Sequence, residues 1–213
     1  MTPSLTFSHK KTSYITLMDG TKIKGTIKDI DRKKGLIEEI KIKDGNGKKH
    51  KLKPKSVKFM YLPPSGLDNV MKSLDMATSV SKWNDEKLEQ DLLNKGYIYF
   101  ENTDVKIKKK TMNLLMQLLN PSFSKQVKVY HDPFAKETRS LNIGMVEVAG
   151  GNAKSYYIKA GDSNAAFKVQ KKRYKDEFKP LWDDCSELIT KYGDKIKWSE
   201  LTQHVLDYSG CQN

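Results

Sequence analysis

The sequence predicts an α+β protein, and three observations support this prediction. Residues 13–62 alternate apolar and polar side chains with the period of β-strands, residues 96–170 repeat that alternation, and residues 171–213 carry apolar side chains at helical spacing. We therefore expect a small N-terminal antiparallel β meander or barrel, a helical connector, a second antiparallel β region and a C-terminal helical pair. The expected boundaries are 1–62, 63–95, 96–170 and 171–213, with a disulfide as one interpretation of the last segment.

The N-terminal region is predicted to contain five short strands. Ile15 and Leu17 alternate with polar residues up to Asp19-Gly20, a dipeptide typical of β-hairpin turns. Ile23 and Ile27 then alternate with lysines. The three remaining strands are expected at 36–42, 50–52 and 57–62, before Pro63-Pro64.

The connector changes to helical spacing, and the chain then returns to strands. Leu67, Val70, Met71 and Leu74 predict one short helix, and Asn84 is expected to begin a second. The apolar run 112–119 fits a helix or a buried strand equally well. The other β runs are expected at 97–109, 126–130, 144–148, 155–159 and 166–169.

The C-terminal segment is predicted to be helical. One face carries apolar side chains at intervals of three and four residues, and Pro180 is expected to divide or kink this stripe. A last helix is expected to begin near Ser199. The residues of the stripe and of the last helix's buried side are Tyr174, Phe178, Leu181, Cys185 and Leu188, then Leu201, Val205 and Tyr208.

Positive charge is concentrated in the two β regions. The formal net charge is +13, and residues 1–60 carry 16 Lys and Arg against 6 Asp and Glu. Lysines that alternate with buried residues should project from the solvent faces of the strands, where they could bind an anion or serve only solubility and edge protection. The candidate anion-binding residues are Lys22, Lys24, Lys41, Lys43, Lys106 and Lys108.

Several kinds of site are not predicted. The chain contains no apolar run long enough for a membrane-spanning helix, no Cys/His cluster with zinc spacing and no phosphate-binding loop around Gly150-Gly151. His131 and Asp132 lack a neighbouring nucleophile motif, so neither an enzyme nor a cofactor is predicted. The aromatic residues Tyr97, Tyr99, Phe100, Tyr156 and Tyr157 fit a half-buried sheet better than a base-stacking surface.

Spacing alone leaves the state of the two cysteines open. Cys185 and Cys211 lie 26 positions apart within the final fifth of the chain, which suits a disulfide or two unrelated reduced thiols. The residues from Met1 to Lys11 lack the pattern of a signal peptide, so the chain as written is expected to stay where it is made unless it is a processed form.

Two family resemblances bear on function. The segment Ile15–Lys28 resembles the opening of Sm-like RNA-binding barrels. Over more of the chain, Pro54–Phe59, the tyrosine-bearing strands, Asp184–Leu188 and Tyr208–Cys211 are similar to uncharacterised exported proteins of Bacteroidetes. That second resemblance implies an exported setting, which permits the Cys185–Cys211 disulfide, and it implies no activity.

We therefore predict a non-enzymatic binding or structural protein of the cell envelope, periplasmic or secreted. Its partner would be an anionic polymer or an envelope protein at the basic β surface. The alternative is a cytoplasmic RNA-binding protein with an Sm-like barrel, and a hydrolase built from residues distant in sequence ranks third.

Overall fold

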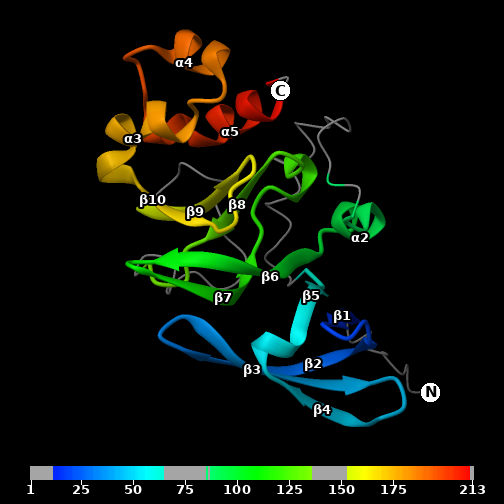
Figure 1. The fold of residues 1–213 in the computed structure, drawn as a ribbon. Helices are drawn as coiled ribbons and strands as arrows, with labels where there is room; N and C mark the ends of the chain where they lie inside the picture. The colour runs from blue at the N-terminus through cyan, green and yellow to red at the C-terminus, as the bar shows by residue number, and fades with distance from the viewer. Residues whose placement is uncertain (1–11, 65–84, 86, 136–152, 212–213) are drawn as a thin grey trace, which may run out of the picture.

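The computed structural model describes residues 12–64, 85, 87–135 and 153–211, and it confirms the α+β class. Antiparallel sheets occupy most of the described chain, and helices gather at its C-terminal end (Figure 1). In this view the helices lie above a small sheet, and a larger sheet extends below it to the N-terminal meander.

The larger sheet is open and has seven antiparallel strands in the order β4-β3-β2-β1-β5-β6-β7. Because β5 pairs with β6, main-chain hydrogen bonds join the two β regions expected from the sequence. The strands are β1 (Ser13–Leu17), β2 (Lys22–Lys33), β3 (Leu36–Asp44), β4 (Lys49–Leu52), β5 (Val57–Leu62), β6 (Ile98–Ile107) and β7 (Lys110–Gln117).

The N-terminal part of this sheet is a bent meander. The pairing of β2 with β3 shifts register between Ile27 and Asp29 and again between Asp31 and Arg32, and such bulges bend a strand. The inner face buries one apolar cluster, and the sheet stays open instead of closing into a barrel. The cluster includes Ile15, Ile40, Ile42, Val57 and Met60.

The smaller sheet has the order β10-β9-β8 and is buried on both faces. It consists of β8 (Val127–His131), β9 (Ser155–Ala160) and β10 (Phe167–Gln170). Val129 and Ile158 face the C-terminal helices, whereas Tyr130 and Tyr157 pack into the cluster shared with β5–β7. The backbone of Ala166 bonds to Asp104 and Lys106 of β6, so the two sheets are directly connected.

Three helices cover the outer face of the smaller sheet. They are α3 (Tyr174–Leu181), α4 (Ser186–Tyr192) and α5 (Leu201–Ser209). The predicted apolar stripe is buried, and α3 ends one residue after Pro180, which divides the stripe. The last helix begins at Leu201, after a 3-10 turn (Trp198–Glu200) that contains Ser199.

The remaining elements resolve the other expectations. The undecided run 112–119 lies largely in strand β7, and the connector contains the short helix α2 (Gln90–Asn94). The helix expected from Asn84 begins later, at Gln90, and Asp85 and residues 87–89 are not helical. Asn84 itself, the helix expected over Leu67–Leu74 and the strand expected at 144–148 lie outside the described residues. Short 3-10 turns occur at Pro54–Ser56, Pro121–Phe123 and Lys171–Arg173.

Candidate anion-binding face

The lysines of the N-terminal meander share the face opposite its apolar cluster. Lys22 and Lys24 flank the buried Ile23 on β2, and Lys43 lies opposite Thr26 in the β2–β3 pairing. Two further lysines of β4 share this face because Lys49 pairs with Lys43 and Lys51 pairs with Lys41. These two were missed from the sequence, although His50 and Leu52 alternate with them.

Every carboxylate between residues 22 and 52 already has a partner. Lys41 contacts two of them, with its Nζ 3.0 Å from Asp29 and 2.9 Å from Asp31. Hydrogen bonds to these carboxylates raise the pKa of Lys41 and, in turn, lower the pKa of Asp29. Lys41 is therefore not available to an anion in this arrangement. The other pairs are Glu38 with Lys33, Glu39 with Lys53 and Asp44 with His50.

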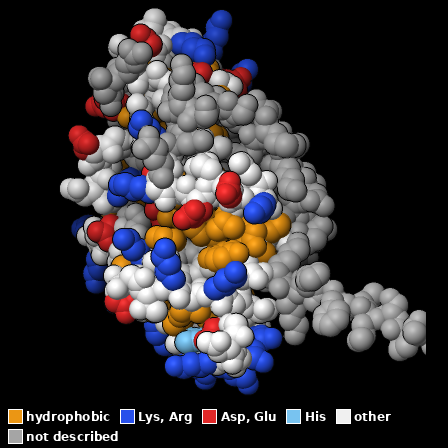
Figure 2. Space-filling model, turned by 90° about the vertical axis from the view of Figure 1, so that its right-hand side faces the viewer, with side chains coloured by type: hydrophobic (Ala, Val, Ile, Leu, Met, Phe, Trp, Pro, Cys, Tyr) orange, Lys and Arg blue, Asp and Glu red, His pale blue; other side chains and the backbone are white. Residues whose placement is uncertain are grey.

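The remaining lysines form a positive surface that we call the lysine face. Its members are all exposed, and within the described part of the chain none has a carboxylate at salt-bridge distance. Blue side chains gather at the lower end of the molecule, where the meander lies (Figure 2). The lysine face consists of Lys22, Lys24, Lys43, Lys49 and Lys51.

Lys106 and Lys108 belong to a different part of the molecule. They lie at the hairpin between β6 and β7, at the edge of the sheet away from β4. Lys108 has a positive φ of 56° in this turn. The structure therefore brings four of the six candidate lysines to one face and places these two elsewhere.

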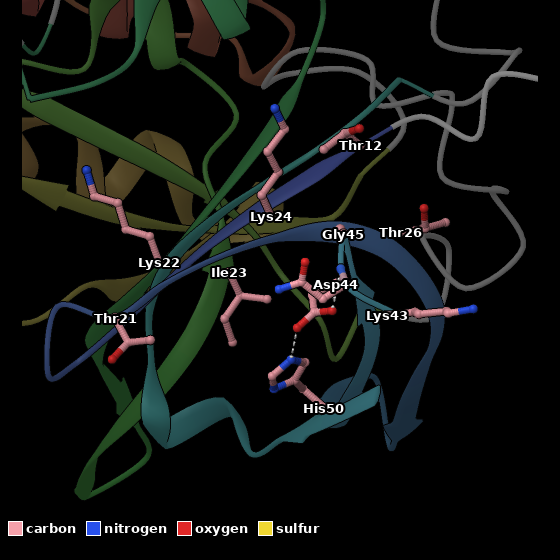
Figure 3. Close-up of a pocket in the computed structure, with 12 residues that line it drawn as sticks. Thr12, Thr21, Lys22, Ile23, Lys24, Thr26, Lys43, Asp44, Gly45 and His50 are labelled. Atoms are coloured by element: carbon pink, nitrogen blue, oxygen red, sulfur yellow. Dashed lines mark hydrogen bonds and ion pairs between the residues drawn. The ribbon is translucent and has the colours of Figure 1, made fainter. Parts of the chain in front are cut away.

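A hollow of about 550 Å³ lies beside the lysine face and has a different character (Figure 3). Ile23, Asp44 and His50 converge in it, whereas the ammonium groups of Lys22, Lys24 and Lys43 point away. Asp44 accepts hydrogen bonds from His50 Nε2 at 2.8 Å and from the backbone of Asn46 and Lys48. The hydrogen bond from His50 lowers the pKa of Asp44. Asp44 therefore holds the β3–β4 turn.

Most of the aromatic residues singled out in the sequence are core residues. Tyr99, Phe100, Tyr156 and Tyr157 are buried, as the half-buried-sheet interpretation predicts. Tyr97 retains partial exposure, and its hydroxyl donates to the carbonyl of Thr12 at 3.0 Å. These tyrosines therefore do not form an open base-stacking surface.

A buried polar network surrounds Asp132. Its carboxylate accepts hydrogen bonds from Ser155 Oγ at 2.6 Å and lies 2.7 Å from Lys168 Nζ. Burial lowers the pKa of the adjacent His131. Because the Ser155 hydroxyl donates to Asp132 and both side chains are buried, this Ser, Asp and Lys set ties the strands together.

Cys185 and Cys211 form a disulfide that joins the start of α4 to the end of α5. Across the described ranges, no group of three or more His, Cys, Asp and Glu side chains is arranged to hold a metal ion. The same part of the chain contains no helix with the length and apolar character required to span a membrane.

No protein-family model, curated protein or solved structure matches the chain.

Proposed function

We propose that this protein is a non-enzymatic binding module of the cell envelope whose lysine face holds an anionic polymer. The observation that supports this proposal is the charge balance of β2–β4, where every carboxylate has a basic partner, whereas the five lysines of the lysine face have no carboxylate at salt-bridge distance among the described residues. Lys43 and Lys49 lie directly opposite each other, and like charges in that position destabilise a sheet. A polyanion would relieve this repulsion.

The envelope location is part of the proposal and draws on the disulfide. Disulfides persist in secreted and periplasmic proteins and are rare in the reducing cytosol. Lysine also dominates the positive charge, since the chain has only three arginines among its 39 Lys and Arg. The ammonium group of lysine acts as a point charge. It therefore suits a polymer with repeated charges better than it suits a nucleic-acid base, which is recognised by paired hydrogen bonds.

The test measures binding of labelled inorganic polyphosphate by fluorescence anisotropy over a range of salt concentrations. The double variant Lys24→Gln/Lys43→Gln should weaken binding about thirtyfold and make the salt dependence shallower, because each lysine near a polyanion contributes roughly 1 kcal/mol. The matched control Lys106→Gln/Lys109→Gln removes the same charge from the β6–β7 hairpin and should have a much smaller effect. Equal effects of the two variants would contradict a specific lysine face.

A further inference from the structure

The lysine face continues into a row of aromatic rings on the same face of the larger sheet. Lys24 pairs with Tyr14, Tyr14 pairs with Tyr61, and Tyr61 pairs with Tyr99, so one lysine and three tyrosines cross four strands in register. Residues directly opposite in an antiparallel pair share a face. Lys24 Nζ lies 5.7 Å from the centre of the Tyr14 ring, which places the ammonium beside the aromatic surface.

A second row lies two residues along the strands. Lys22 pairs with Thr16, Thr16 pairs with Phe59, and Phe59 pairs with Glu101. Lys22 and Lys24 are therefore roughly 7 Å apart along β2, with a hydroxyl and an aromatic ring beside them. Like the first row, this second row therefore begins with a lysine and contains an aromatic ring, but it ends in the carboxylate of Glu101, which is paired with Lys128.

The outer ends of both rows are accessible. Tyr14, Thr16 and Phe59 are partly exposed, as is Tyr97, whose ring centre lies 5.9 Å from that of Tyr14. Figure 2 shows hydrophobic side chains at the surface on the side of the molecule that carries β1 and β5, with both basic and acidic side chains around them. The inner ends are closed because Tyr61 and Tyr99 are only 2% and 5% exposed.

We infer that the anionic polymer is an acidic polysaccharide, whose sugar rings pack on Tyr14, Phe59 and Tyr97 while its carboxylates meet Lys22 and Lys24. This inference rests on the proposed function. A polyuronate carries a carboxylate on every sugar and also offers apolar C–H surfaces and hydroxyl groups. Polyphosphate has no apolar surface.

A single-stranded nucleic acid fits this surface less well. Stacking of successive bases uses an open series of ring faces. Here the two innermost rings of the tyrosine row are buried, and the exposed Tyr14 and Tyr97 rings are tilted by 51° to each other. This burial and tilt of the rings therefore favour sugar rings over stacked bases.

The test compares labelled oligogalacturonate, inorganic polyphosphate and single-stranded RNA, matched in charge, on the full chain. The variant Tyr14→Leu/Phe59→Leu keeps apolar bulk and removes the rings. It should weaken oligogalacturonate binding about tenfold, or roughly 1.4 kcal/mol, and leave polyphosphate binding unchanged. The control Met112→Ala removes an exposed apolar side chain of β7 and should change neither.

A second measurement uses the unaltered protein and does not depend on folding of a variant. Raising the salt concentration should weaken both ligands, but at about 1 M salt, where the ionic contacts are screened, oligogalacturonate binding should remain measurable while polyphosphate binding is lost, because only the sugar has a contact that salt does not screen. Loss of both ligands at high salt, or RNA binding that is tightest and falls in the aromatic variant, would overturn the polysaccharide. If Lys24→Gln/Lys43→Gln still weakened polyphosphate binding, the proposed lysine face would stand even though the polysaccharide had been excluded. If this lysine variant bound polyphosphate as tightly as the unaltered chain, both proposals would be wrong.

Discussion

Gly35 connects the tip of the β2–β3 hairpin to the segment after β8. Its φ of +87° is in the left-handed region, and a Cβ at this position would overlap the carbonyl oxygen of Pro133. Glycine is therefore required here by both the backbone conformation and a close approach. The contact links residues almost 100 positions apart.

Replacing Gly35 with alanine should lower the free energy of unfolding by about 2–3 kcal/mol, because the backbone of Pro133 must move to accept the methyl group. Urea denaturation measures the change. Gly20→Ala is the control, since Gly20 has almost the same φ of +86° and nothing lies within 4 Å of the position that its methyl group would take. Similar losses of stability in both variants would show that the positive φ, and not the contact with Pro133, causes the loss.

His204 lies fully buried among aromatic rings in the C-terminal helices. Its Nδ1 lies 2.7 Å from the Tyr174 hydroxyl, and the rings of Phe178 and Tyr192 pack against it. Burial is the main reason that the pKa of His204 falls from 6.5 to about 4. Lys191 contributes to this shift, whereas Glu200 and Asp207 oppose it. The imidazole is thus held neutral in the folded protein.

This lowered pKa predicts a loss of stability in acid. The unfolded chain binds a proton at His204 near pH 6.5, whereas the folded chain does so only near pH 4. The stability that the neutral His204 contributes is therefore fully present above pH 6.5 and is lost as the pH falls from 6.5 to 4, by roughly 3 kcal/mol. Urea unfolding across this range should show a smaller loss for His204→Gln than for the unaltered chain. Parallel pH profiles would contradict the assignment.

At the scale of elements, the network around Asp132 joins all three strands of the smaller sheet. Asp132 directly follows β8, Ser155 begins β9, and Lys168 lies in β10. The carboxylate side chain has no exposed surface. Its charge is therefore balanced inside the protein.

Asp132→Asn should destabilise the protein by about 2–4 kcal/mol, because it removes the charge that balances Lys168 and weakens the bond to Ser155. Thermal or urea unfolding measures this loss. Asp29→Asn is the matched control, since it changes an exposed carboxylate that also pairs with a lysine, and it should have little effect. A loss of the same size in both variants would argue against the importance of burial.

The sequence predicts strands better than it predicts which strands are neighbours. Alternation identified β1–β5 and the solvent-facing lysines because this signal is local. The bulge between Ile27 and Asp29 places Asp29 opposite Lys41, and no residue pattern indicates it. The tyrosine row requires β1 to pair with β5 and β5 with β6, over sequence separations that alternation does not reveal.

At the scale of the whole molecule, the Cys185–Cys211 disulfide closes the C-terminal helices over the smaller sheet. Both half-cystines belong to the apolar cluster between these helices and the sheet. The bond closes a loop across 26 positions, which in the chain-entropy model corresponds to roughly 3–4 kcal/mol of stability.

Reduction should therefore lower the free energy of unfolding by that amount, and Cys185→Ser/Cys211→Ser should reproduce it. The chain has only these two cysteines, so a reductant acts at one bond. Hydrogen exchange should show faster exchange in α4 and α5, with β2 and β3 unchanged. A uniform change over the chain would contradict a local effect.

The position of β1 has a consequence for biosynthesis. This strand, the first described element of the chain, lies at the centre of the seven-stranded sheet. One side of β1 can pair with β2 as soon as both are made, but the other waits for β5. Until β5 is made, the edge of β1 that will pair with it is unpaired and exposes apolar residues. Such an edge is prone to aggregation while the chain is still being synthesised or held by a chaperone.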